Sequence, residues 1–85
     1  MKRAYKLRAY PTRPQEGRAV RLLTEWGFEE LGLERLELLI DSTNAASERV
    51  AERAGYVREG ILRSVWFKED IRLDQAVWAR LRTDL

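Results

Sequence analysis

The sequence of 85 residues contains no cysteine and no histidine, and these two absences exclude many kinds of functional site. Disulfide bonds, thiol chemistry and zinc sites built from Cys and His cannot occur, and neither can Ser-His or Cys-His catalytic pairs. Any catalysis must therefore use carboxylates, hydroxyls, phenols, lysine amines or backbone groups. The sequence predicts no metal site.

Long apolar runs are also missing. The longest, Leu38-Leu39-Ile40, is far too short for a transmembrane helix. The start of the chain, Met1-Lys2-Arg3-Ala4, is not followed by an apolar run, so we expect no signal peptide and no membrane association. The expected compartment is the cytoplasm.

Positively charged residues only slightly outnumber negatively charged ones. Lys and Arg number 16 and Asp and Glu number 14, which leaves a net charge of +2. Nucleic-acid binding is therefore not indicated by charge, although a phosphate-bearing ligand would suit the mild positive field. Apolar residues make up 45% and charged residues 35%, which is typical of a globular protein, and the length predicts one domain over residues 1–85.

The two prolines, Pro11 and Pro14, separate the first two predicted elements. Residues 4–10 alternate loosely, as in a half-buried strand, and a helix is predicted over residues 15–31. Gly32 follows it as a left-handed cap. The following residues are predicted to form the buried face of this helix: Ala19, Leu22, Leu23, Trp26 and Leu31.

The segment Leu36-Glu37-Leu38-Leu39-Ile40 is apolar on both faces and predicts a central strand. Capping residues 41–44 then introduce a short helix that ends at Gly55, with Val50, Ala51 and Ala54 facing inward. Its charged residues, among them Glu48 and Glu52, are expected on a solvated face.

Two long strands complete the chain. Residues 56–67 predict a strand bent near Gly60, residues 68–70 a turn, and residues 71–81 an antiparallel partner. The predicted order is β-α-β-α-β-β, with parallel pairing of the first two strands. The fold class is therefore α/β with a mixed sheet.

Two segments are candidates for ligand binding. The loop from Pro11 to Arg18 leads into a helix start, where backbone N–H groups bind phosphate, although every loop between a strand and a helix shares this geometry. Asn44 could donate to a ligand and Ser47 could act as an acid. Both residues could equally be helix caps, with Ser47 reaching back to Asn44, and from the residues alone capping is favoured.

Aromatic residues form a third group. They could stack on bases, but core packing or an oligomer interface is the commoner use. The group consists of Trp26, Trp66, Phe67 and Trp78.

The order of residues resembles the GNAT acetyltransferases, and most closely the branch that acts on ribosomal-protein N-termini. The similarity covers about residues 13–85 and corresponds to the C-terminal half of that fold. It includes the long helix and strand over residues 19–38 and the ordered match that follows it. That match comprises Asp41, Asn44, Ala46-Ser47, Val50-Ala51-Glu52, Ala54-Gly55-Tyr56, Arg58-Glu59-Gly60 and Leu62-Arg63.

The resemblance implies a set of site residues. The family's pyrophosphate loop corresponds to the segment that contains Arg13, Gln15, Gly17 and Arg18, and the contact to the pantetheine arm of acetyl-coenzyme A corresponds to Asn44. Ser47 corresponds to the serine that protonates the leaving thiolate. Ala51 stands where many other members carry a tyrosine for that task.

This sequence departs from the family pattern in its loop and in its length. Thr12 and Pro14 stand at glycine positions of the family's loop, and Glu16 replaces a small residue, which predicts weakened cofactor binding. The family domain is about twice as long, so one edge of the first strand would be bare. We expect a homodimer, joined through that strand or through surfaces that bear tryptophan.

Two functions follow from these observations. The first is an acetyl-coenzyme-A-dependent N-acetyltransferase. The second is a non-catalytic dimerisation or binding module that keeps half of the fold. A nucleic-acid binder that uses the arginines is a weaker third.

Overall fold

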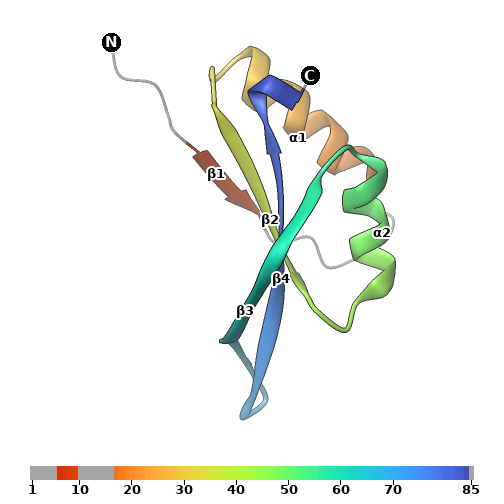
Figure 1. The fold of residues 1–85 in the computed structure, drawn as a ribbon, viewed down its shortest axis with the longest axis vertical. Coiled ribbons are helices and arrows are strands. Elements are labelled where there is room, and N and C mark those ends of the chain that lie inside the picture. The colour runs from red at the N-terminus through yellow and green to blue at the C-terminus, as the bar shows by residue number, and fades with distance from the viewer. Residues whose placement is uncertain (1–5, 10–16, 85) are drawn as a thin grey trace.

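The computed structural model describes residues 6–9 and 17–84, and the elements follow the predicted order (Figure 1). They are β1 (Lys6–Ala9), α1 (Gly17–Glu29), β2 (Arg35–Asp41), α2 (Ala45–Arg53), β3 (Val57–Lys68), β4 (Ile71–Leu81) and a 3-10 helix, η2 (Arg82–Asp84). The predicted α/β class is confirmed.

The four strands form one mixed sheet in the order β1-β2-β4-β3. β1 runs parallel to β2, with Lys6 opposite Arg35 and Ala9 opposite Leu38. β4 lies between β2 and β3 and is antiparallel to both. The predicted parallel pair and the predicted hairpin are therefore both present, and β1 and β3 are the edge strands.

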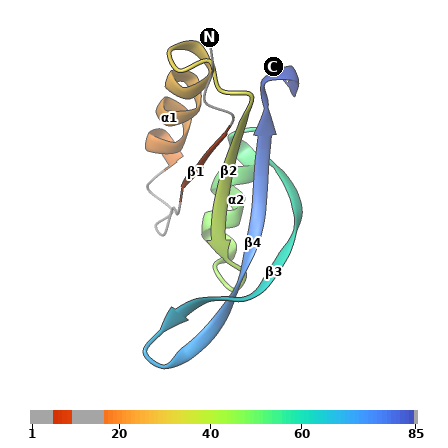
Figure 2. The ribbon, with the colours of Figure 1, turned by 90° about the vertical axis from the view of Figure 1, so that its left-hand side faces the viewer.

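Both helices cover the same face of the sheet, which leaves the other face open (Figures 1 and 2). Leu36, Leu38 and Ile40 of β2 belong to the core beneath the helices, while Leu39 is buried on the opposite face. This arrangement confirms β2 as an inner strand with apolar side chains on both faces.

The buried face of α1 differs from the predicted one. Leu22 and Trp26 are 56% and 50% exposed, and the helix instead buries Val20, Thr24, Gly27 and Phe28. Gly27 explains the difference, because a Cβ there would lie only 3.0 Å from Cδ1 of Leu33. The missing side chain lets the helix approach the sheet closely, so the buried stripe passes through a glycine and a threonine.

The helices end where glycines adopt left-handed conformations. α1 ends at Glu29, two residues earlier than predicted, and Gly32 has φ of 64°. Gly55, with φ of 87°, ends α2 and donates to the carbonyl of Glu52, while Tyr56 donates to that of Ala51. No helix within residues 17–84 is long and apolar enough to cross a membrane.

The β3–β4 hairpin is long and irregular. The pairing shifts between Arg58 and Gly60, which confirms the predicted bend, and again between Leu62 and Trp66. A two-residue turn joins the strands, in which Glu69 and Asp70 have φ of 50° and 64°. The end of this hairpin projects beyond the layer of helices (Figure 2).

Candidate cofactor-binding site

The starts of the two helices lie at the same edge of the sheet. α1 follows β1 and α2 follows β2, and these two strands are parallel, so both helices begin at the carboxyl ends of the strands. A Cβ placed on Gly17 would lie 3.5 Å from Cγ1 of Val50, which shows that α1 begins against α2. Open α/β sheets bind ligands at such an edge, and helix starts favour anions.

The structure brings some of the predicted cofactor-binding residues to this edge. Gly17 and Arg18 are the first two residues of α1, and Arg18 is exposed. Asn44 precedes the first residue of α2. Arg13 and Gln15 lie outside the described residues.

Asn44 caps α2, as the sequence predicts. Its Oδ1 accepts the backbone N–H of Ser47 at 3.1 Å, and its own N–H donates to the carbonyl of Asp41 at 2.8 Å. The cap uses the oxygen of the side-chain amide. The donor of this side chain is its NH₂ group.

The hydroxyl of Ser47 does not take part in capping. The side chain is 1% exposed, and its Oγ has no hydrogen-bond partner among the described residues. The predicted bond back to Asn44 through this hydroxyl is therefore wrong. A buried hydroxyl without a partner is unfavourable by about 1–3 kcal/mol in general, so this atom is a candidate to meet a ligand.

Glu48, the next residue, anchors the first turn of α2 to the sheet. Its Oε1 accepts hydrogen bonds from Nε1 of Trp78 at 2.8 Å and from Nε of Arg58 at 2.9 Å. The expectation that Glu48 lies on a solvated face is wrong, because its side chain is only 18% exposed. These contacts span 30 and 10 residues, and no local pattern in the sequence indicates them.

The tyrosine that follows α2 is committed elsewhere. The hydroxyl of Tyr56 lies 2.6 Å from Oγ1 of Thr24, which itself donates to the carbonyl of Val20 at 2.7 Å, so Tyr56 is the donor to Thr24. Burial raises the pKa of Tyr56, although the positive charge of Arg80 opposes the rise. Ala51, where a catalytic tyrosine would stand, is fully buried in the core. Ser47 is thus the hydroxyl available on α2.

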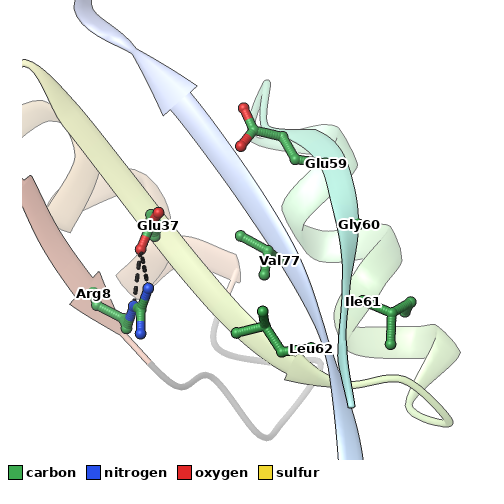
Figure 3. Close-up of a pocket in the computed structure, with 7 residues that line it drawn as sticks. All are labelled: Arg8, Glu37, Glu59, Gly60, Ile61, Leu62 and Val77. Atoms are coloured by element: carbon green, nitrogen blue, oxygen red, sulfur yellow. Dashed lines mark hydrogen bonds and ion pairs between the residues drawn. The ribbon is translucent and has the colours of Figure 1, made fainter.

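The open face of the sheet carries an ionic cluster, defined here as Arg8, Arg35, Glu37 and Glu59. Arg8 donates to Glu37 Oε1 at 2.8 Å (Figure 3), and Arg35 donates to Glu37 Oε2 at 2.9 Å. Arg35 also reaches Glu59 Oε1 at 2.6 Å across β4. An open hollow of about 360 Å³ adjoins the cluster, with Leu62 and Val77 in its lining.

Glu37 is the central member of this ionic cluster, and its side chain is 6% exposed. Burial raises the pKa of Glu37, but the hydrogen bonds and charges of Arg8 and Arg35 outweigh burial and hold the pKa below its ordinary value. No role for this residue was predicted from the sequence. The available signal was a glutamate between two apolar residues of a strand predicted to be central.

Comparison with known proteins gives consistent results. A family model described as "Acetyltransferase (GNAT) domain" matches residues 17–57. The chain is 39% identical over 66 residues to "Probable N-acetyltransferase YjcK" of Bacillus subtilis, an alignment that covers 78% of this chain. It is 38% identical to a solved probable acetyltransferase of the GNAT family from Chromobacterium violaceum, with a TM-score of 0.72 over 80% of this chain.

A ribosomal-protein-S5-alanine acetyltransferase from Vibrio fischeri shares the fold, with 24% identity and a TM-score of 0.74 over 80% of this chain. The chain spans only 36% of the Bacillus protein, 34% of the Chromobacterium protein and 37% of the Vibrio protein. Similarity thus extends over most of this chain but over little more than a third of each relative.

Proposed function

Because this chain belongs to the GNAT acetyltransferase family, we propose that it binds acetyl-coenzyme A and takes part in acetyl transfer to an amine. The cofactor, when bound, supplies an acetyl group activated as a thioester. Residues 1–85 form one cofactor-binding unit in this proposal, and the proposed compartment is the cytoplasm.

The observation that carries the proposal is the buried hydroxyl of Ser47. Its Oγ holds a proton that no described residue accepts, in the first turn of a helix at the carboxyl edge of the sheet. Acetyl transfer produces a thiolate, which is stabilised by a positioned O–H donor. Ser47 has the O–H group that this step needs.

The cofactor is proposed to be held by the two helix starts. Backbone N–H groups of Gly17 and Arg18 at the start of α1, together with the Arg18 charge, suit phosphate oxygens. Arg13 and Gln15 of the preceding segment complete the proposed phosphate site. The NH₂ group of Asn44 is assigned to a carbonyl of the pantetheine arm, because the cap already uses the Asn44 oxygen.

Titration calorimetry with acetyl-coenzyme A tests the proposal. Asn44→Ser keeps a good, uncharged N-cap but removes the amide donor, so we expect at least about fivefold weaker binding with the helix intact by circular dichroism. Ser47→Ala should change affinity by no more than about twofold and slow acetyl transfer at least about tenfold. Absence of binding heat at high cofactor concentration would reject cofactor binding.

A second candidate function is a non-catalytic dimerisation or binding module. One observation favours it: Val65, Phe67 and Ile71 are exposed at the end of the hairpin. We propose a homodimer in either case, because β1 and β3 are edge strands of the described sheet. A chain that dimerises but does not bind acetyl-coenzyme A would have this second function.

A further inference from the structure

The place of the Ser47 hydroxyl depends on how α2 lies against the sheet. α2 has nine residues, and Ser47 belongs to its first turn. If a helix rolls by about 20°, a side-chain atom about 5 Å from its axis moves by roughly 2 Å. Misplacement by about 1 Å can slow an enzymatic step about a hundredfold. The contacts that prevent α2 from rolling are therefore important for the proposed chemistry.

The C-terminal end of α2 is held by apolar packing and by Arg80. Ala51 and Ala54 belong to the core, and Nη1 of Arg80 donates to the carbonyl of Ala54 at 2.9 Å. These contacts lie mostly about two turns away from Ser47. The first turn of α2 needs contacts of its own to be fixed with similar precision.

The cap at the start of α2 is a local contact. Oδ1 of Asn44 accepts the N–H of Ser47, and the carbonyl of Asn44 accepts the N–H of Glu48, both at 3.1 Å. These bonds join residues three and four positions apart. They order the turn itself but do not attach it to the strands beneath it.

Glu48 attaches this turn to the sheet. Its Oε1 accepts hydrogen bonds from Nε1 of Trp78 at 2.8 Å and from Nε of Arg58 at 2.9 Å. Trp78 and Arg58 lie opposite each other in the pairing of β4 with β3, so both donors come from one cross-strand pair. The Trp78 side chain is packed in the core, which makes the indole N–H a rigid donor.

The dipole of α2 gives a second reason for an acidic residue at this position. Negative charge is favourable in the first turn of a helix, and Glu48 is the acidic residue of that turn. An exposed carboxylate would serve this purpose without any particular partner. The Glu48 side chain is mostly buried and bonded to donors on two other elements, which is more than the dipole requires.

We propose that Glu48 is a positioning residue for Ser47, a role that rests on the proposed acetyl transfer. Glu48 fixes the roll of α2 through Trp78 and Arg58. Ser47 is its neighbour, about 100° around the same turn, so its hydroxyl is fixed as well. Loss of the contact should slow acetyl transfer more than it weakens cofactor binding, because the proposed phosphate site lies at the start of α1.

Kinetics and calorimetry separate these two effects. Transfer is measured at saturating acetyl-coenzyme A with a short peptide that has a free N-terminal amine. Glu48→Ala should slow it at least about tenfold and change the affinity for acetyl-coenzyme A by no more than about twofold. Glu48→Gln keeps an acceptor for the indole and should restore the rate to within about threefold of the wild type. The control Arg80→Met loosens the other end of α2 and should leave the rate within about twofold of the wild type.

A double mutant tests whether Glu48 acts through Ser47. In a chain that carries Ser47→Ala, the added Glu48→Ala should slow transfer by no more than about twofold. A further loss of about tenfold would overturn the proposal. Trp78→Phe removes the indole N–H but keeps the Glu48 charge and most of the core packing. It should reproduce the slow transfer, and it provides the same test if Glu48→Ala does not fold.

Hydrogen exchange followed by NMR tests the role in the free chain. In Trp78→Phe the amides of Ser47 and Glu48 should exchange at least about tenfold faster. Those of Arg53 and Ala54 should change by no more than about threefold. Uniform acceleration along α2 would show a loss of overall stability and would overturn the positioning role alone. A wild-type chain that transfers no acetyl group would instead reject the proposed acetyl transfer, and this role with it.

Discussion

The indole N–H of Trp78 donates a 2.8 Å hydrogen bond to Oε1 of Glu48, and this bond ties the first turn of α2 to the middle of β4. Trp78 is a core residue, 7% exposed, so its N–H has little access to water. Ser47 precedes Glu48 directly. The same contact that holds the helix therefore also fixes the position of the proposed catalytic hydroxyl.

Removal of this acceptor should destabilise the fold. Glu48→Ala leaves the buried indole N–H without a partner, and we expect a loss of about 1–3 kcal/mol in the free energy of unfolding. Glu48→Gln keeps an acceptor and loses mainly the exposed pair with Arg58, so its cost should stay within about 1 kcal/mol. Urea unfolding measures both. The control Glu52→Ala, at an exposed position one turn later, should change stability by less than about 0.5 kcal/mol, and an equal loss there would contradict the assignment.

The ionic cluster should make stability depend on pH in the acid range. The pKa of Glu37 is lowered in the folded protein, so its stabilising contribution is complete above its ordinary value of 4.5 and is lost as pH falls through the folded value. Glu37→Gln should be less stable than the wild type at pH 7, with a gap that narrows from about pH 4.5 downwards. Chemical unfolding at a series of pH values measures the gap. A gap that is constant with pH would show that the carboxylate charge is not involved.

The pair formed by Thr24 and Tyr56 should respond asymmetrically to mutation. Thr24→Val removes the acceptor and leaves the buried Tyr56 O–H unsatisfied, so we expect a cost of about 1–3 kcal/mol. Tyr56→Phe leaves the Thr24 O–H bonded to the Val20 carbonyl and should cost only about 0.5–1.5 kcal/mol. A double-mutant cycle by thermal unfolding measures their coupling. Equal single costs with no coupling would contradict the assigned direction of donation.

Tyr56 should also limit stability in alkali. Burial raises its pKa above 10.0, so the contribution of the neutral phenol is complete below that value and is lost as pH rises through the folded pKa. The free energy of unfolding is measured over a range of about two pH units upward from pH 9. It should decline in the wild type, and the decline should be smaller in Tyr56→Phe. An equal loss of stability in both proteins would show that other groups determine the stability in alkali.

Residues that tolerate positive φ should stabilise the turn between β3 and β4. Glu69 and Asp70 both adopt positive φ, which Asn-Gly tolerates at less cost in a two-residue turn. The double substitution Glu69→Asn with Asp70→Gly should stabilise the chain by about 0.5–1 kcal/mol, or raise Tm by several degrees. The matched control changes both residues to Ala, which removes the charges but keeps the unfavourable φ, and it should lose stability. A gain in the control would attribute the effect to charge.

Features that depend on neighbouring residues could be predicted from the sequence. The alternation of Leu36, Leu38 and Ile40, the cap at Asn44 and the turn at Glu69 each follow from residues a few positions apart. Packing across the fold could not be predicted in the same way. The buried side of α1 was misassigned, because size pointed to Leu22 and Trp26, whereas close approach to β2 required Gly27.

In the candidate site too, features set by neighbouring residues could be predicted from the sequence, whereas features set by distant residues could not. Asn44 was correctly identified as a cap, because its acceptor lies three residues from its donor. The isolation of the Ser47 hydroxyl depends on burial by distant segments, and the role of Glu48 depends on a tryptophan 30 residues away. Neither has a local signature, so both needed the folded structure.

The different burial of the tryptophans gives this chain internal optical probes. Trp78 is 7% exposed beneath α2, whereas Trp66 in the outer part of the β3–β4 hairpin and Trp26 on α1 are 43% and 50% exposed. In variants that retain one tryptophan, emission from Trp78 would follow the docking of α2 against the sheet, and emission from Trp66 would follow events at the outer part of the hairpin. Helix docking and self-association could thus be timed separately in one protein without an added dye.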